Sequence, residues 1–405
     1  MSLDEAASQL ADHLARQEFV EVYAHHDADG IAAASILCIA MLRRKMRFRL
    51  RIKARINAGD FTPGAGVLLC DFGSGIEELP EEVMVVDHHL PRFRGGLHVN
   101  PRLFGVDGDR ELSAAGTAYL VARKLGDNRD LAGLAMLGIL GDGQDLEGKN
   151  LEIFNEAVAQ SVITPERGYR LPGRDMHESL LSAINPYLHQ ISGDEMAAAD
   201  LIDAASGEDE PEPDVLLSLI VMRISPYSPV ETLTSLYGDR FSLEREIIPD
   251  AHAFTAVVDA CGKCGRGGLA ASLCLRSPDG LAEAWETAIH HRMRVVHAIR
   301  AALQKGGEDG FFQVDEVSVA SDVADAISRD SLIETPILVA TKAKELCYIS
   351  ARSPHDLSID LGDAVREAAV QSGGFGGGHR RRAGATISSS RLDQFRTHLA
   401  EVLAA

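Results

Sequence analysis

Short apolar segments alternate with helical stretches through the first 145 residues of the chain. The stretch from about residue 113 to residue 142 is rich in alanine and leucine, and we expect it to be helical. Such alternation is typical of a parallel sheet with helices on both faces, so the predicted fold class is α/β. The predicted strands are 20–24, 47–53, 67–71 and 83–87.

The pattern changes after residue 150. Residues 151–205 and 215–250 are predicted to be helical, and the acidic stretch between them, 206–214, is predicted to be a linker. A mixed segment follows and closes on a glycine-rich run at 372–385; its predicted strands are 254–259, 269–275, 336–341 and 346–350. The predicted domains are an α/β domain over 1–205, a linker and helical region over 206–253, and a smaller mixed α/β domain over 254–405.

The composition is that of an ordinary globular protein. Of the 405 residues, 45% are hydrophobic and 25% are charged, and the absence of any apolar run of about 18 residues argues against a membrane span. The first residues predict an amphipathic helix rather than a signal peptide, so we expect a cytoplasmic protein. The single CxxC pair, Cys261 and Cys264, lacks the second pair of a structural zinc site, so we expect buried free thiols.

The charge is unevenly distributed. A formal net charge of −20 argues against tight binding of long nucleic acids, yet eight of the thirteen residues from Arg43 to Arg55 are basic. From Arg47 to Lys53 basic and apolar residues alternate, which predicts a strand with one apolar and one basic face. Two interpretations remain open: an edge strand charged to prevent aggregation, or a track for phosphates.

Polar clusters follow three of the predicted strands, at the point where each strand ends. In open parallel sheets ligands bind beyond the carboxyl ends of the strands, so these clusters lie where such a fold forms a site. A further carboxylate lies among glycines that allow close backbone approach. Taken alone, the first cluster also fits a solvated turn with helix-capping aspartates. The candidate ligands are His25, Asp27, Asp29, Asp71, His88 and Asp142.

These residue types together predict a site for divalent metal ions. Four clustered carboxylates would repel one another, and two divalent ions remove that cost. Mixed aspartate and histidine ligation suits manganese, with magnesium and cobalt as alternatives. Two ions about 3.5–4 Å apart clamp the attacking and leaving oxygens of a phosphoryl displacement.

The ordered set of motifs resembles that of the DHH phosphoesterases. The set comprises HxDxDG from His25, the strand-end Asp71, the DHH triplet at 87–89 and Asp142 within GDG. The run from Gly376 to His379 is similar to the GGGH signature of the C-terminal domain associated with that family. The resemblance extends over nearly the whole chain and is weakest over about 150–250.

The resemblance implies a role for each ligand. His25 and Asp27 are expected to hold one metal, with Asp71 bridging to a second metal. The second metal is expected to be held by Asp29, His88 and Asp142, and hydroxide between the metals is expected to attack phosphorus. His89 is expected to orient a ligand or steady charge on the phosphate. Asn100–Pro101 and the helix start at Ser113–Gly116 are expected to shape the site.

The same resemblance implies that the C-terminal domain clamps the substrate. Backbone N–H groups of Gly376, Gly377 and Gly378 would approach an anion, and His379 would add a donor toward the scissile phosphate. Arg352 is expected to pair with a phosphate or stack on a base. Arg380, with the two arginines after it, departs from the usual family pattern and favours an extended anionic substrate.

Among the members of this family, the chain is most similar to RecJ-like single-strand exonucleases of the archaeal branch, which release mononucleotides. The HxD spacing disfavours a pyrophosphatase, which has a longer motif. An oligoribonuclease, a cyclic dinucleotide phosphodiesterase and a non-catalytic scaffold of a replication or repair complex remain alternatives. The expected partners are single-stranded nucleic acid or oligonucleotides and a replication or repair protein.

Overall fold

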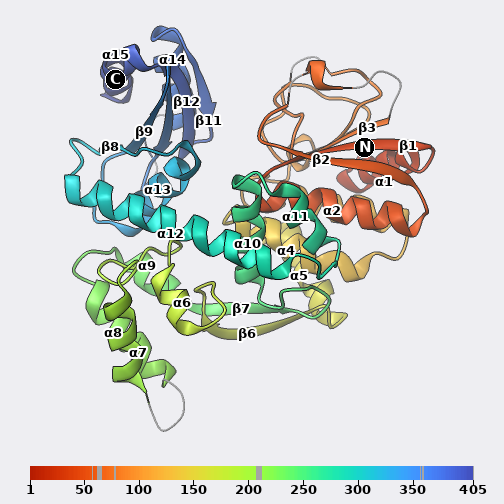
Figure 1. Ribbon diagram of the computed structural model, residues 1–405. Helices are drawn as coiled ribbons and strands as arrows, with labels where there is room; N and C mark the ends of the chain where they lie inside the picture. The colour runs from red at the N-terminus through yellow and green to blue at the C-terminus, as the bar shows by residue number, and fades with distance from the viewer. Residues whose placement is uncertain are drawn as a thin grey trace. The chain divides into compact units, whose positions relative to one another are not determined.

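The computed structural model divides the chain into two compact units (Figure 1). The first unit comprises residues 1–168 and 239–288, and the second comprises 169–238 and 289–405. The predicted domain boundaries at 205 and 253 remain a prediction, and residues 207–211 of the predicted linker lie outside the described residues. The structure describes residues 1–56, 58–61, 66–76, 79–206, 212–355, 357 and 360–404.

A parallel sheet forms the centre of the first unit. Its described strands follow the order β2-β1-β3-β4-β5, and each adjacent pair is parallel. The α/β fold class is therefore confirmed, and the four predicted strands all exist. The two-residue strand β5 was not predicted. The strands are β1 (Phe19–His25), β2 (Arg47–Lys53), β3 (Gly66–Cys70), β4 (Met84–Val86) and β5 (His98–Val99).

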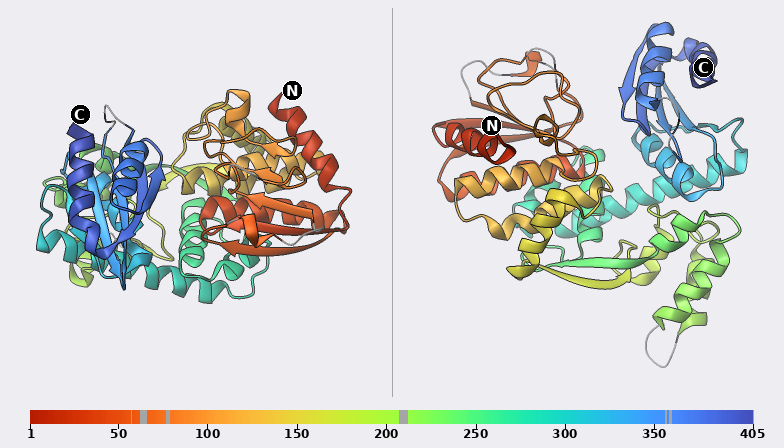
Figure 2. Two further views of the ribbon diagram at one scale, coloured as in Figure 1. Left: turned by 90° about the horizontal axis from the view of Figure 1, so that it is seen from above. Right: turned by 180° about the vertical axis from the view of Figure 1, so that it is seen from behind.

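Helices cover one face of this sheet. Helices α1, α2 and α3 pack there in a shared apolar core with the inward side chains of β1, β3 and β4, and α4, α10 and α11 pack against α2. Figures 1 and 2 show α1 beside the sheet at the N-terminus. The helical segments of this unit are α1 (Leu3–Leu14), α2 (Ala28–Arg43), η1 (Ala58–Asp60), η2 (Pro101–Phe104), α3 (Ala114–Leu125), η3 (Arg129–Leu131), α4 (Ala132–Gly141), α5 (Gly148–Ala159), α10 (Ala251–Lys263) and α11 (Gly267–Cys274).

The opposite face of the sheet differs from the prediction of helices on both faces. Its buried side chains, which include Tyr23 and Leu69, pack against apolar residues of connecting segments, such as Phe61, Phe72 and Phe93. No described α-helix contributes to this cluster. Loops therefore cover β1, β3 and β4 on the face of the sheet on which His25 and Tyr23 lie.

Two segments predicted as strands are helices. Residues 254–259 and 269–275 fall in α10 and α11, although both are rich in apolar residues. The Asp250 carboxylate caps α10 by accepting a hydrogen bond from the Ala253 N–H at 2.8 Å. Both helices join the core of the first unit, so tertiary packing decided between helix and strand.

The chain passes between the units within β6 (Ile163–Tyr169), β7 (Tyr237–Leu243) and α12 (Leu281–Lys305). β6 and β7 form a two-stranded sheet in segments that the sequence predicted to be helical. Residues 164–167 of β6 are all exposed, so this strand lacks the apolar alternation that marks a buried strand.

The second unit ends in a mixed sheet of order β11-β12-β10-β9-β8. Helices α14 and α15 pack on one face, as Figures 1 and 2 show, and α13 packs on the other. The predicted strands at 336–341 and 346–350 are β9 and β10. The elements of this unit are α6 (Met176–Leu181), α7 (Glu195–Ala205), α8 (Pro213–Ile224), α9 (Val230–Ser235), β8 (Phe311–Gln313), α13 (Val317–Asp330), β9 (Ile337–Ala343), β10 (Leu346–Arg352), α14 (Leu361–Gln371), β11 (Phe375–Gly378), β12 (Arg382–Ser388), η4 (Ser389–Arg391) and α15 (Leu392–Ala404).

Two expectations from composition can be compared with the structure. None of the helices in the described ranges has both the length and the apolar content needed to cross a membrane. All six cysteines are free, and Cys264 is the one that is not fully buried. Cys261 packs in the core of the first unit, in agreement with its predicted structural role.

Candidate metal centre

The predicted ligands gather at the carboxyl edge of the sheet in the first unit. His25 ends β1, Asp71 follows β3, and His88 lies just after β4. These strands are parallel neighbours, so their carboxyl ends meet at one edge. Asp29 lies in the first turn of α2, and Asp142 caps the C-terminal end of α4. The structure thus brings together all six residues that the sequence proposed as ligands.

A first group consists of His25, Asp27 and Asp71. Nδ1 of His25 lies 2.7 Å from an Asp27 oxygen and 3.2 Å from Oδ2 of Asp71. The other Asp27 oxygen accepts a hydrogen bond from the Gly30 N–H, which anchors the carboxylate at the start of α2. A Cβ atom at Gly30 would lie 2.7 Å from the Cβ of His25, so this turn requires glycine.

A second group consists of Asp29, His88 and Asp142. Nε2 of His88 lies 3.7 Å from an Asp29 oxygen and 3.3 Å from an Asp142 oxygen. The ligand atoms in each group lie within 4.8 Å of one another, a span over which they can converge on one ion. Asp29 and His88 are buried, whereas the side chain of Asp142 is one-quarter exposed.

Asp71 lies between the two groups. Its Oδ2 faces His25, while its Oδ1 lies 3.4 Å from Nε2 of His88. The backbone of Asp71 is left-handed, with φ of +58°, and its N–H donates to the Val86 carbonyl at 2.8 Å. This arrangement directs one oxygen to each group, as a bridging carboxylate requires.

The orientation of His88 is fixed by a backbone carbonyl. Its Nδ1 lies 2.5 Å from the Gly108 oxygen and donates to it, so Nε2 is the ring nitrogen that faces the cluster and could bind a metal after losing its proton. The Gln144 amide donates to the same carbonyl at 2.8 Å, and Asn150 donates to the Gln144 oxygen at 2.9 Å. Such outer contacts hold a metal-binding imidazole in one tautomer.

Asp87 organises the DHH turn and lies in neither ligand group. One of its oxygens accepts from the backbone N–H groups of His88 and His89 and from Nδ1 of His89 at 2.8 Å. Its other oxygen accepts from the Ser74 N–H. Burial opposes the charged form, but the His89 imidazole and these donors outweigh it and hold the pKa of Asp87 well below its usual value.

The two segments expected to shape the site both contact it. The buried Asn100 amide donates to the His89 carbonyl and to Ser74, each at 2.8 Å. At the start of α3, the N–H groups of Ala114 and Ala115 donate to the two oxygens of Asp29 at 2.8 and 2.7 Å. A helix N-terminus therefore holds the most deeply buried carboxylate of the cluster.

The charge and donor set of the cluster fit two divalent cations. Four carboxylates carry four negative charges, and two divalent ions would neutralise all of them. Oδ1 of Asp71 and Oδ2 of Asp142 are buried and accept no hydrogen bond from the described residues. Burial and the Asp142 and Asp71 carboxylates raise the pKa of Asp29 well above its usual value, and burial raises the pKa of Asp142 to about 6. Buried oxygens without donors and repelling carboxylates are what bound cations would relieve.

We expect divalent metal to stabilise the protein more strongly as pH rises. Burial lowers the pKa of His89, but Asp87 and Asp71 outweigh it and raise that pKa to about 9. Asp27 and Asp71 likewise raise the pKa of His25 against burial. The metal-free protein should therefore lose stability between about pH 6.5 and pH 9, as these imidazoles give up protons. Metal binding at His25 displaces the proton of that imidazole.

Differential scanning fluorimetry tests this expectation. Adding 1 mM MnCl2 should raise Tm by about 5 °C more at pH 8 than at pH 6.5. Sodium chloride at matched ionic strength serves as the control. A rise in Tm that is equal at both pH values would contradict the proton displacement.

The predicted substrate residues of the second unit lie in its C-terminal sheet. Arg352, at the end of β10, donates to both oxygens of Asp325 at 2.6 and 3.2 Å and to the Ser321 hydroxyl at 2.8 Å. The same Asp325 accepts from Arg382 at 2.9 Å. Burial opposes the charged form, but the two guanidinium groups hold the pKa of Asp325 well below its usual value.

The glycine run forms an edge strand. Gly376, Gly377 and Gly378 belong to β11, which pairs with β12, and the His379 N–H donates to the Arg382 carbonyl at 2.6 Å across the turn. A Cβ atom at Gly378 would lie 2.3 Å from that carbonyl, so the turn requires glycine there. Arg380 is exposed and donates to the Leu357 carbonyl. An anion-binding role for these residues remains a prediction.

Replacing Arg352 should destabilise the second unit. The side chain is 12% exposed and supplies both hydrogen bonds of a bidentate pair, so Arg352→Ala leaves the Asp325 carboxylate with the partly exposed Arg382. We expect a loss of about 3 kcal/mol in the free energy of unfolding, measured in urea. Arg382→Gln, which removes the other partner at an exposed site, should cost less than about 1 kcal/mol. Equal losses would contradict this difference.

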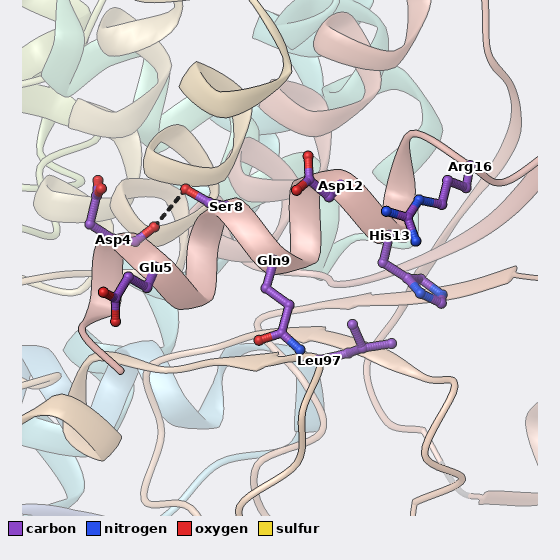
Figure 3. A pocket seen from close by; sticks show the side chains of 8 residues that line it. All are labelled: Asp4, Glu5, Ser8, Gln9, Asp12, His13, Arg16 and Leu97. Carbon is purple, nitrogen blue, oxygen red and sulfur yellow. Dashed lines mark hydrogen bonds between the residues drawn. The ribbon is translucent and has the colours of Figure 1, made fainter.

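A depression of about 470 Å³ lies on the outer side of α1 (Figure 3). Its lining is mostly acidic and polar, and the Ser8 hydroxyl donates to the Asp4 carbonyl at 2.9 Å beside it. It includes none of the predicted ligands. The lining residues are Asp4, Glu5, Ser8, Gln9, Asp12, His13, Arg16 and Leu97.

Several residues that position the side chains of the metal centre and of the Arg352 pair were not identified from the sequence. Gly108 acts through its backbone carbonyl, which any residue carries, and Gln144 donates to that carbonyl from its side chain, so no pattern indicated them. Asp325 pairs with Arg352 from 27 positions away. Gly138 was noted only as allowing close approach, yet a Cβ atom there would lie 1.9 Å from Oδ1 of Asp29.

Comparisons with known proteins agree with this architecture. Residues 314–405 match the DHHA1 domain family. An uncharacterized protein of Methanocaldococcus jannaschii is 25% identical over 415 residues, covering 95% of this chain and 93% of that protein. The C-terminal domain predicted from the GGGH signature is therefore confirmed.

Solved structures share the fold at low identity. RecJ from Thermus thermophilus, in complex with Mn2+, matches with a TM-score of 0.61 and 19% identity over 99% of this chain. This chain spans 54% of that RecJ. CDC45 from Entamoeba histolytica matches with a TM-score of 0.64 and 12% identity over 100% of this chain and 99% of that protein. The chain thus carries a C-terminal DHHA1 domain over residues 314–405, and its fold is similar to that of these RecJ and CDC45 structures.

Proposed function

We propose that this protein is a two-metal phosphodiesterase that acts as a single-strand-specific exonuclease and releases mononucleotides. The observation that carries the proposal is the pair of ligand groups joined by Asp71, whose two oxygens face His25 and His88. The groups share a short span at the edge of a rigid sheet, as a two-metal phosphoryl-transfer site needs.

The ligand residues would hold two divalent ions, and manganese suits their mixture of aspartate and histidine. When bound, such ions supply Lewis-acid stabilisation of the phosphoryl oxygens and activation of a water nucleophile. Structures of Thermus RecJ with Mn2+ and with Mg2+ support a divalent ion, and magnesium and cobalt are the alternatives to manganese. His25 and Asp27 would serve one ion and Asp29, His88 and Asp142 the other.

His89 would steady charge on the scissile phosphate. Its side chain is 39% exposed at the surface of the cluster, and Asp87 anchors its Nδ1 at 2.8 Å. The ring therefore stays in one orientation beside Asp71, 3.4 Å from its Oδ1. A positioned imidazole of this kind stabilises developing charge without reorganising during the reaction.

The DHHA1 domain would bind the substrate. Gly376, Gly377, Gly378, His379 and Arg380 remain the proposed contacts, because backbone N–H groups and exposed cations suit phosphates. Arg352 is proposed to act mainly through the β10–β12 region that it fixes, since Asp325 and Ser321 already accept from its guanidinium. Single-stranded nucleic acid or oligonucleotides would be the substrate, and a replication or repair protein is a proposed partner.

A non-catalytic scaffold is the second candidate, since the fold matches CDC45 at least as well as RecJ. The complete ligand set favours catalysis, because four carboxylates in one place are costly unless they bind metal.

Digestion of 5′-labelled single-stranded DNA and RNA with Mn2+ tests the proposal, with a cyclic dinucleotide and pyrophosphate alongside. Degradation of the strands to mononucleotides is the expected result, and their relative rates distinguish DNA from RNA. Activity confined to dinucleotides would instead assign an oligoribonuclease or cyclic dinucleotide phosphodiesterase. No activity on any substrate, despite metal binding, would favour the scaffold.

A further inference from the structure

A row of four basic side chains runs along the edge strand β2. The apolar residues that alternate with it pack into the core of the first unit, so the basic residues share the opposite face. β2 ends the order β2-β1-β3-β4-β5, so no described strand covers its outer edge. We call this set the basic row: Arg47, Arg49, Arg51 and Lys53.

The basic row ends beside the metal centre. In the parallel pairing of β1 with β2, Lys53 lies opposite His25, and Arg47 lies opposite Phe19 at the far end. Directly opposite residues share a face, so Lys53 is the lateral neighbour of a proposed ligand. At a rise of about 3.3 Å per residue, the basic row extends roughly 20 Å from the metal centre.

Carboxylates on β1 and in η1 hold the inner part of the basic row in place. Glu21, 5% exposed, pairs with Arg51 at 2.8 Å and approaches Arg49 at 3.9 Å. The Arg51 guanidinium also lies 5.4 Å from the centre of the Tyr23 ring, and Lys53 pairs with Asp60 at 3.2 Å. The pairs fix the positions of the cations and leave them partly exposed.

The outer part carries excess positive charge. Arg47 is exposed, and the Arg49 side chain is 62% exposed at 3.9 Å from its nearest carboxylate. The four cations face two carboxylates, Glu21 and Asp60, so the basic row keeps a positive excess on a chain with a net charge of −20. One or two charged side chains are enough to protect an edge strand from pairing with the edge of another sheet. That protection does not require four cations aligned toward the metal centre.

We infer that the basic row binds successive phosphates of the single strand whose end is cleaved at the metal centre. This inference rests on the proposed function and assigns a binding surface to it. Alternate side chains on a strand are about 6.6 Å apart, which suits the phosphate spacing of an extended single strand. A compact oligonucleotide of two or three residues would not reach Arg47 and Arg49.

Binding of 5′-fluorescein dT12 and dT3, followed by anisotropy at 50–300 mM salt with Ca2+ in place of Mn2+, tests the inference. The test variant is Arg47→Gln/Arg49→Gln, and thermal unfolding checks that it is folded. The control is Arg129→Gln/Arg167→Gln, which removes the same charge from exposed pairs elsewhere in the first unit.

Loss of two phosphate contacts should weaken dT12 binding about 10-fold at low salt and reduce the slope of log K against log salt by about 1.4. The gain in affinity from dT3 to dT12 should shrink, and the control should match wild type. A test variant that binds both strands as wild type does would overturn the inference.

Digestion of dT12 by wild type in Mn2+ is measured in parallel to separate the two proposals. If wild type digests dT12 but the test variant binds it equally well, the exonuclease proposal stands and the binding role of the basic row is rejected. If the test variant binds dT12 more weakly but wild type does not digest it, the exonuclease proposal is rejected and the basic row remains a nucleic-acid-binding surface. Absence of both binding and digestion rejects both.

Discussion

Asp71→Asn should lower kcat/KM on single-stranded DNA by at least about 1000-fold, roughly 4 kcal/mol of transition-state stabilisation. The substitution removes charge from the carboxylate whose two oxygens face the two ligand groups, at 3.2 Å from His25 and 3.4 Å from His88. Both ions should therefore bind more weakly, and the Mn2+-induced rise in Tm should shrink as well.

Asparagine is a sharper test than alanine at this position. The backbone of Asp71 is left-handed, and alanine there would add a conformational cost of about 1–2 kcal/mol that is unrelated to metal binding. Asparagine tolerates that conformation and keeps the shape of the side chain. Asp127→Asn, at an exposed ion pair with Arg129, is the matched control and should retain full activity. Activity of Asp71→Asn above about one-tenth of wild type would reject the bridging role.

Four strands of the parallel sheet and the residues of the polar cluster could be predicted because both depend on local sequence. Buried parallel strands are continuous apolar runs, and each run here stops at a polar residue that the fold then delivers to one edge. His25 and Asp71 are 46 positions apart, yet the rule for parallel sheets alone places them together. The fold class and the composition of the cluster therefore follow from pattern.

The contacts that orient the side chains of the cluster could not be predicted in this way. Asp29 is held by the N–H groups of Ala114 and Ala115, and His88 by the Gly108 carbonyl, which are backbone atoms present in every residue. The basic strand could be predicted only in part. The alternation predicted its two faces, but only the pairing register shows that Lys53 lies beside His25.

The errors arose where the pattern was ambiguous or weak. The apolar segments at 254–259 and 269–275 fit a strand or a buried helix equally, and packing against α2 and α4 decided for helices. One tight contact of this packing is visible at Gly262, where a Cβ atom would lie 1.6 Å from the His26 carbonyl. Such a contact depends on residues more than 200 positions apart.

Gly138→Ala should disrupt the second ligand group from within a helix. The added Cβ would lie 1.9 Å from Oδ1 of Asp29 and 2.6 Å from the Ser113 hydroxyl, so either the Asp29 carboxylate or α4 must move. Alanine favours a helix by about 1 kcal/mol over glycine, yet we expect a net loss of about 1–3 kcal/mol in stability from this overlap. Activity should fall at least about 100-fold, because a ligand displaced by a fraction of an ångström no longer meets its partners.

The control for this substitution is another glycine in a helix of the same unit. Gly268 lies in α11, and a Cβ atom there would meet nothing within 4 Å. Gly268→Ala should therefore leave activity unchanged and raise stability by about 0.5 kcal/mol. Urea unfolding measures the change in stability of each variant. In a titration with Mn2+, only Gly138→Ala should need more metal than wild type to reach half of the maximal rise in Tm. Activity of Gly138→Ala within about threefold of wild type would contradict the expected displacement of Asp29 and would mean that α4 moves instead.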